Sequence, residues 1–280
     1  MHTTNLMSSS SDLLTEELKC SICLEVFTDP VSTLCGHNFC KSCLDKCWDK
    51  SQTCSCPYCK ETFNQRPDLR VNTTLREVAE HYKKKLKQTE LKWMQQYAVD
   101  VTLDPETAHP ELILSDDGKQ VRHGDIWQKL PNNSKRFDTY LFVLGKKGFS
   151  SGRFYFEVQV EGKTSWDLGV AQGSINRKGE ILPSPSNGWW TLILRNGNKY
   201  INCVNPPVSI SVRVKPQRVV VFVDYEEGLV SFYDVETSSH IYSYTDQRFF
   251  GELYPYISPC LNGGGKNSSP LIITPVNYNK

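Results

Sequence analysis

Eight cysteine and histidine residues recur at short, regular spacings between residues 20 and 59. They form four pairs, which in chain order are Cys20/Cys23, Cys35/His37, Cys40/Cys43 and Cys56/Cys59. Zn²⁺ in structural sites takes four such ligands in a tetrahedron, and a Cys-x-x-Cys turn supplies two of them. The pattern therefore predicts two structural zinc ions per chain, in a region with too little apolar surface to fold without metal.

The order of the pairs indicates which ligands share a metal. The second and third pairs lie side by side within residues 35–43, too close in sequence to hold one metal and still leave a core between two sites. We therefore expect an interleaved cross-brace. One zinc is assigned to Cys20, Cys23, Cys40 and Cys43, and the other to Cys35, His37, Cys56 and Cys59.

Other interpretations of these cysteines fit the sequence less well. A disulfide framework needs an oxidising compartment, but residues 1–14 contain no apolar signal core. A redox Cys-x-x-Cys would be a single motif, whereas several are present here beside a Cys-x-His. Cys47 and Cys54 lie outside the spacing and are expected to be small buried or half-exposed thiols, while Cys203 and Cys260 are expected to be core residues.

Length and composition limit what the rest of the chain can be. With 280 residues, 39% of them hydrophobic, the chain can form one large and one small domain. A net charge of +1 gives no indication of nucleic-acid binding. The longest apolar runs, such as 219–223, have strand length and are too short to cross a bilayer. We expect a soluble cytoplasmic protein, with the nucleus as a second location.

A helix is predicted after the last zinc ligand. Apolar residues recur there at steps of three and four, typical of one helix face; they are Val71, Leu75, Val78, Tyr82 and Leu86. Thr74 and Glu77 have capping-box spacing, and the helix is expected to reach about Tyr97. Its lysines are interpreted as a solvated face, because no aromatic platform interleaves them. The predicted organisation is a zinc domain over 1–70, a helical linker over 71–98 and a second domain over 99–280.

The second domain is predicted to be all-β. From about Val99 the apolar period changes to two, and in 153–160 it places Phe154, Phe156 and Val158 on one face and Tyr155 and Glu157 on the other. Similar short runs follow at 166–172, 190–195, 199–203, 218–224, 229–235, 240–244, 254–258 and 270–274, with turn signals such as 196–197 between them. Many short strands with regular turns indicate a β-sandwich. This domain has neither a glycine-rich phosphate-binding loop nor the nucleophilic serine motif of hydrolases, so we expect it to be a binding module.

These motifs resemble the tripartite-motif family, and within it the teleost bloodthirsty-like branch. The segments ELKCSICLEVFTDPV, CGHNFCKSCL, CPYCK and VNTTLREVAEHYKK resemble its RING finger and the helix that follows. The segments VTLDPETAHPELILSDDGKQVRHGD, GRFYFEVQVEGKTSWDLGVA, VVVFVDYEEGLVSFYDV and LNGGGKNSSPLIITPVN resemble its PRY-SPRY (B30.2) domain. One difference is that residues 60–98 contain neither a B-box nor a long coiled coil.

The resemblance implies a RING-type E3 ubiquitin ligase. A RING binds a ubiquitin-conjugating enzyme and holds its thioester-linked ubiquitin in position for attack by a substrate lysine. Closed four-ligand zinc sites have no free coordination position, so the catalysis must consist of positioning. The alternative is a non-catalytic or dominant-negative interaction protein that uses both domains only to bind.

The resemblance also assigns residues to these contacts. Ile22 and Pro57 are expected in an exposed groove for the conjugating enzyme, with Lys60 as the linchpin cation that contacts both enzyme and ubiquitin. Trp48 belongs either to this groove or to packing between the zinc sites. Contact with ubiquitin, or simply solvated surface, is expected for Glu16, Glu17 and Asn72.

Two further surfaces are implied. A weak homodimer through the helices that flank the RING would use Leu13, Leu14, Leu18, Val71, Leu75 and Val78, unless these side chains pair within one chain. An unknown protein target is expected on the SPRY domain. Strand alternation turns Asp167, Ile193 and Arg195 away from the core. The resemblance implies that these positions and the loop at Leu261 and Asn262 border the partner-binding surface, and an ordinary solvated sheet face is the equal alternative.

Overall fold

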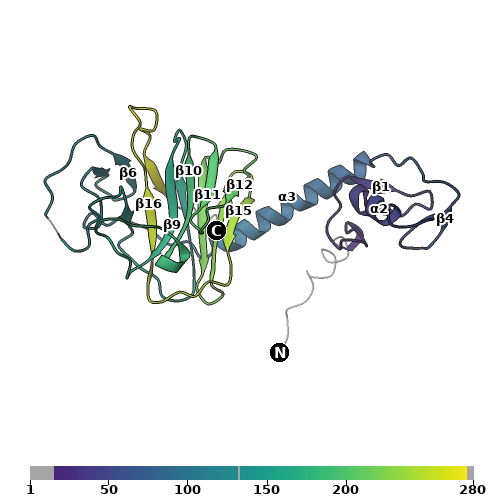
Figure 1. The fold of residues 1–280 in the computed structure, drawn as a ribbon, viewed down its shortest axis with the longest axis horizontal. Coiled ribbons are helices and arrows are strands. Elements are labelled where there is room, and N and C mark those ends of the chain that lie inside the picture. The colour runs from purple at the N-terminus through teal and green to yellow at the C-terminus, as the bar shows by residue number, and fades with distance from the viewer. Residues whose placement is uncertain (1–15, 132, 276–280) are drawn as a thin grey trace. The chain divides into compact units, whose positions relative to one another are not determined.

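The computed structural model describes residues 16–131 and 133–275 (Figure 1). The chain forms two compact units, Met1–Thr89 and Glu90–Lys280. We call them the N-terminal and the C-terminal unit and describe each by itself. Leu13 and Leu14, which were assigned to a helix before the first zinc ligand, lie outside the described residues.

The N-terminal unit is built from two short hairpins and a helix. The strands β1 (Pro30–Ser32) and β2 (Asn38–Cys40) are antiparallel, α2 (Lys41–Trp48) follows at once, and β3 (Cys54–Ser55) pairs with β4 (Thr62–Phe63). The buried core consists of Cys20, Phe27, Val31, Phe39, Cys40, Leu44, Trp48, Cys56 and Ala79. Because several of these residues are zinc ligands, the core and the metal sites must form together.

Helix α3 (Thr73–Gln95) begins in the N-terminal unit and ends in the C-terminal unit. The Leu75 N–H donates to Asn72 Oδ1 at 3.0 Å. Asn72 is therefore the N-cap, and the capping box predicted at Thr74 is wrong. A short amide side chain directly before the first helical residue is one of the best acceptors for the free N–H groups of the first turn.

The apolar face predicted for α3 is wrong at Val78 and Leu86. Ala79 is completely buried, and Val71 and Leu75 pack against the same core. Val78 and Leu86 are instead 46% and 45% exposed. The small core of the N-terminal unit contacts the side of the helix that carries Leu75 and Ala79, so Val78 and Leu86 are left largely exposed.

The C-terminal unit is a sandwich of two antiparallel sheets. The six-stranded sheet has the order β12 (Ser209–Ile210), β11 (Lys199–Asn202), β10 (Trp189–Arg195), β9 (Trp166–Gln172), β16 (Leu253–Ser258) and β7 (Val143–Leu144). The seven-stranded sheet has the order β15 (Ser239–Tyr244), β14 (Leu229–Asp234), β13 (Arg218–Asp224), β8 (Arg153–Gln159), β17 (Leu271–Thr274), β6 (Gln120–His123) and β5 (Leu112–Leu114). A 3-10 turn, η1 (Pro185–Asn187), precedes β10. The predicted all-β sandwich is confirmed.

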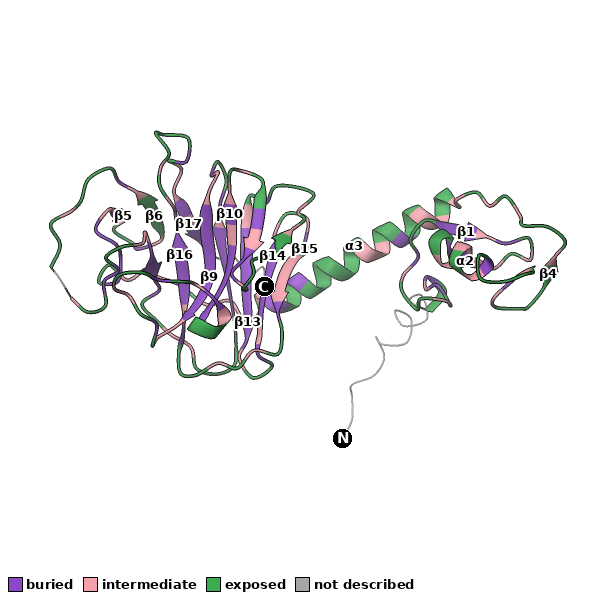
Figure 2. Ribbon diagram, in the orientation of Figure 1, coloured by how far each residue is buried: buried purple, intermediate pink, exposed green. Residues whose placement is uncertain are grey.

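The core of this unit lies between the sheets and is rich in aromatic residues (Figure 2). Trp166, Trp189 and Phe156 are at most 1% exposed. The hairpin predicted at 196–197 joins β10 to β11, and Asn196 and Gly197 there have φ of 54° and 78°. The strands that the sequence missed, β5, β6, β7 and β12, have two to four residues each, too few to show a period.

The second face of β8 is also buried, against the alternation expected from the sequence. Tyr155 is 0% exposed and Glu157 is 2% exposed. Leu91 and Met94, near the end of α3, form a second buried cluster with Tyr155 and with β13 and β14. The last turns of α3 therefore cover this sheet as part of the C-terminal unit. Among the described residues, none of the helices has the length and apolar character needed to span a membrane.

Candidate functional site

The two Cys-x-x-Cys turns that open and close the zinc region have the same backbone geometry. In the first, the Leu24 N–H donates to Cys20 O at 2.8 Å, and Leu24 has φ of 62°. In the second, the Lys60 N–H donates to Cys56 O at 2.9 Å, and Lys60 has φ of 67°. Each chain segment thus turns sharply just after its second cysteine, which brings both sulfurs to one side.

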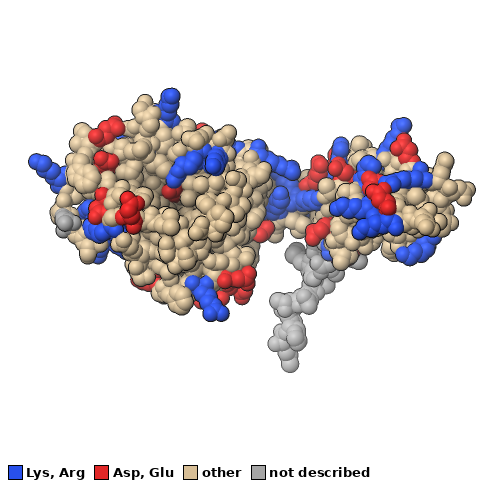
Figure 3. Space-filling model, in the orientation of Figure 1, with Lys and Arg blue, Asp and Glu red and all other residues tan. Residues whose placement is uncertain are grey.

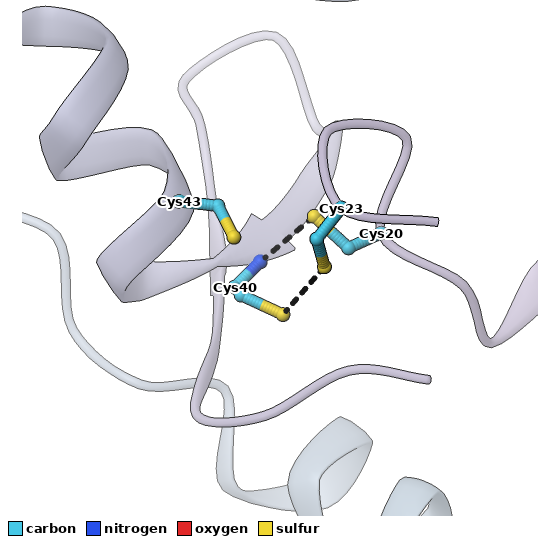
Figure 4. Close-up of side chains that lie close together, drawn as sticks. All are labelled: Cys20, Cys23, Cys40 and Cys43. Atoms are coloured by element: carbon cyan, nitrogen blue, oxygen red, sulfur yellow. Dashed lines mark hydrogen bonds between the residues drawn. The ribbon is translucent and has the colours of Figure 1, made fainter. Parts of the chain in front are cut away.

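The first metal group consists of Cys20, Cys23, Cys40 and Cys43 (Figure 4). Cys23 and Cys40 have their sulfurs 4.0 Å apart, and the Cys40 N–H donates to Cys20 Sγ at 3.4 Å. A tetrahedron with Zn–S bonds of ~2.3 Å has sulfur–sulfur edges of about 3.8 Å. The four sulfurs therefore have the spacing of a zinc site.

The second group consists of Cys35, His37, Cys56 and Cys59. His37 Nδ1 lies 3.3 Å from Cys35 Sγ and 3.7 Å from Cys56 Sγ, and the sulfurs of Cys35 and Cys59 are 3.6 Å apart. These distances again match the edges of a zinc tetrahedron, with His37 binding through Nδ1. The interleaved pairing predicted from the sequence is confirmed.

The electrostatics of the first group also favour a bound cation. Burial, with the charges of Cys20 and Cys23 added, raises the pKa of the Cys40 thiol to about 12. Four thiolates so close together are stable near neutral pH only around a positive charge, which Zn²⁺ supplies. Both groups are closed four-ligand sites, and so the two zinc ions are structural.

The residues expected to contact a conjugating enzyme lie partly at the surface. Ile22 and Pro57 are half-buried, and Ile22 packs one side against the core. Lys60 is exposed, and its Nζ donates to Pro57 O at 2.7 Å. Trp48 is only 5% exposed, and its indole N–H donates to Ser55 O at 2.8 Å. Trp48 therefore packs inside the unit, which was one of its two expected roles.

Three exposed apolar residues near the zinc ligands were missed. Leu24, Leu34 and Tyr58 are 72%, 76% and 67% exposed. Each of the three is adjacent to a zinc ligand in sequence. This position could have predicted their exposure, because a side chain in a tight metal-binding loop has little core to pack against. They are exposed apolar side chains next to zinc ligands, in addition to the half-buried Ile22 and Pro57.

The residues proposed to contact ubiquitin differ in their surroundings. Glu16 and Glu17 are exposed, and Glu16 pairs with Lys19 at 2.8 Å. Asn72 is half-buried and caps α3. Of the described residues of the dimer seam, Leu18 is 5% exposed and Val78 is 46% exposed.

A groove of about 1280 Å³ opens on the C-terminal unit. Asp167, Ile193, Arg195 and Leu261 line it, together with residues from the loops before β10, after β11 and after β16. Asn262 is not among its lining residues; the Asn262 amide donates to Asp125 Oδ1 at 2.5 Å. The structure thus brings four of the five residues chosen for target binding to one concave surface.

Asp167 is not solvent-exposed as the strand alternation suggested. It is 5% exposed because the Arg195 guanidinium covers it, with Nη2 donating to Asp167 Oδ2 at 3.1 Å and Nη1 to Oδ1. Burial, and then the charge of Asp167, raise the pKa of the neighbouring Cys260 thiol to about 12. Cys260 is therefore a neutral thiol in this groove, not a nucleophile.

Two prominent residues of the groove were missed. Trp127 is 55% exposed and stacks edge-on against the buried His109 at 5.1 Å between ring centroids, while Leu182 is 72% exposed. Both lie in loops without periodicity, so only the fold places them in the same groove as Leu261, which is 65% exposed.

Comparison with known domain families gives three matches along the chain. Residues 20–57 match the RING-type zinc-finger, residues 101–149 the SPRY-associated domain and residues 153–269 the SPRY domain. The chain is therefore a RING-type zinc-finger protein with PRY and SPRY domains.

The chain is also similar in sequence to individual proteins. The chain is 48% identical to human Pyrin over 187 residues, which are 67% of this chain and 24% of Pyrin. It is 43% identical to mouse E3 ubiquitin-protein ligase TRIM58 over 183 residues, 65% of this chain and 36% of that protein. Such matches span about a quarter to a third of these relatives. With this domain set and these relatives, the protein is related to the tripartite-motif family, which confirms the predicted resemblance at the level of the RING, PRY and SPRY domains.

A solved structure supports the fold of the larger unit. The crystal structure of the TRIM65 PSpry domain aligns with a TM-score of 0.57 and 21% identity, over 66% of this chain and 94% of that one. At this identity the likeness concerns the fold alone.

Proposed function

We propose that this protein is a RING-type E3 ubiquitin ligase that binds a ubiquitin-charged conjugating enzyme through its N-terminal unit. The observation that carries the proposal is the apolar surface of the two zinc turns. Ile22 and Leu24 lie in and after the first turn, and Pro57 and Tyr58 lie in the second. Exposed apolar residues held by rigid metal sites are well suited to bind a partner at little cost in conformational entropy.

In this proposal the zinc ions hold the two turns and take no part in bond making. Lys60 follows the second turn and is exposed, so its ammonium group can donate to carbonyl groups of the enzyme and of ubiquitin, as it now donates to Pro57 O. Restraint of the thioester in one geometry is the source of rate enhancement. The C-terminal unit would supply the protein substrate through its groove.

The test is ubiquitin transfer by the full chain with a panel of conjugating enzymes. Ile22→Ala should lower the rate at least tenfold while the zinc content stays at two equivalents, because it removes most of a contact side chain and no ligand. Leu86→Ala is the matched control, since Leu86 is 45% exposed on α3 and far from any zinc ligand in sequence.

The result also separates the two classes of function considered for this chain. A zinc-loaded Ile22→Ala protein that transfers ubiquitin at the parental rate would contradict the proposed surface. A parental chain that transfers no ubiquitin with any conjugating enzyme would favour the non-catalytic interaction protein instead.

A further inference from the structure

The groove on the C-terminal unit has an apolar rim. Trp127, Leu182 and Leu261 line it and are more than half exposed, at 55%, 72% and 65%. Large exposed apolar side chains around a concavity are characteristic of protein-binding surfaces, and Trp is enriched among the few residues that dominate their binding energy. The groove volume of about 1280 Å³ is also larger than the ~300–1,000 Å³ usual for small-molecule sites.

The charged residues that line the groove are more often acidic than basic. Its lining contains two cationic residues, Arg195 and Lys266, and three acidic ones, Glu111, Asp138 and Asp167. The forked side of the Arg195 guanidinium is already bound to Asp167. Phosphate and carboxylate ligands are held in proteins by free arginine forks, which this groove lacks.

The remaining polar groups suit an uncharged peptide backbone. Arg195 is 38% exposed, and its Nε–H makes no hydrogen bond within the described part of the chain. Burial lowers the pKa of His109, so this imidazole is neutral beside Trp127. On the face drawn in Figure 3, charged groups of both signs are scattered over the C-terminal unit among uncharged residues. Nucleic acid and other polyanions need a basic surface.

We propose that the groove binds an extended segment of a target protein that inserts a bulky apolar side chain at the rim of Trp127, Leu182 and Leu261 and carries no net negative charge. The proposal rests on the proposed role of the C-terminal unit in substrate selection. A backbone carbonyl of the segment accepts the free Nε–H of Arg195. Acidic and phosphorylated segments are rejected, because Glu111 and Asp138 repel them and Asp167 occupies the arginine.

The experiment is selection of phage-displayed random peptides on the immobilised full chain, followed by affinity measurement with the enriched peptides made synthetically. We expect an aromatic or large aliphatic residue at a fixed position and few acidic residues. Replacing that residue by Ala in the peptide, or Trp127→Ser or Leu261→Ser in the protein, should weaken binding at least tenfold.

Matched controls are available on the same unit. Ile126 is 77% exposed and adjacent to Trp127 but does not line the groove, and Phe250 is 72% exposed and also outside it. Ile126→Ser and Phe250→Ser should leave peptide affinity within about twofold. Enrichment no greater on the parental chain than on the Trp127→Ser/Leu261→Ser double variant would overturn the proposal.

Two further measurements, of anion binding and of autoubiquitination, distinguish the possible reasons for failure. Tight binding of inorganic pyrophosphate, or of a phosphoserine peptide, that is lost in Arg195→Ala would show an anion site and overturn the proposal. Autoubiquitination is measured on the parental chain and on the control variant Phe250→Ser, which lies outside the groove, and it should be the same in both. A parental chain without ligase activity would contradict the proposed RING function. It would leave the peptide-binding result, and so the proposal for the groove, unaffected.

Discussion

Leu91 tests whether the end of α3 is a structural part of the C-terminal unit. Its side chain is 6% exposed and belongs to the buried cluster with Met94, Tyr155 and Phe222. Truncation of a buried Leu to Ala costs about 2–5 kcal/mol, and the lower half of that range applies at a helix that can shift toward the cavity. We expect Leu91→Ala to lower the free energy of unfolding of this unit by about 2–3 kcal/mol.

The assay is unfolding followed by tryptophan fluorescence, because Trp48 is the only one of the six tryptophans outside the C-terminal unit. For a unit of this size, about 2–3 kcal/mol corresponds to a fall in Tm of about 4–12 °C. Leu86→Ala, on the same helix at 45% exposed, should change stability by no more than about 0.5 kcal/mol. If Leu91→Ala leaves the fluorescence transition where it is in the parental protein, the helix end does not stabilise the sheet and this reasoning fails.

Three further predictions concern the N-terminal unit. Elemental analysis should give two zinc per chain, and a strong chelator should unfold this unit while the tryptophan transition of the C-terminal unit persists; one equivalent of zinc would contradict the assignment. Asn72→Ala should destabilise the N-terminal unit by about 1 kcal/mol and Thr74→Ala by less than about 0.5 kcal/mol, since only Asn72 caps α3; equal effects in denaturant unfolding would argue against this cap. The full chain should sediment mainly as a monomer at low micromolar concentration, because Leu75 packs within its own chain and association itself costs at least ~4 kcal/mol. Fusion to an artificial dimeriser should raise its ligase rate, and a tight dimer that survives Leu75→Asp would refute the proposed seam.

The metal sites were almost completely determined by the sequence. Zinc coordination needs particular residue types at short spacings, and spacing is directly visible in a chain such as Cys20–Cys23. The same holds for the strands of the sandwich core, since an apolar period of two and an Asn196-Gly197 turn are local signals. Ile22 could likewise be placed near the surface, because a two-residue metal turn offers no core.

Tertiary structure decided what depends on residues far apart in the chain. Tyr155 is buried because the end of α3 packs against it, and no local pattern records that contact. Glu157 is buried beside the Tyr155 hydroxyl and the Arg218 guanidinium, which both donate to its carboxylate. Asp167 became buried because Arg195 from the next strand covers it. Trp127 lines the groove because its loop packs against the C-terminal unit, where its ring contacts the buried His109. Sequence period reports which face of an element is apolar, but burial and concavity also depend on what packs against that face, and only the folded chain fixes this.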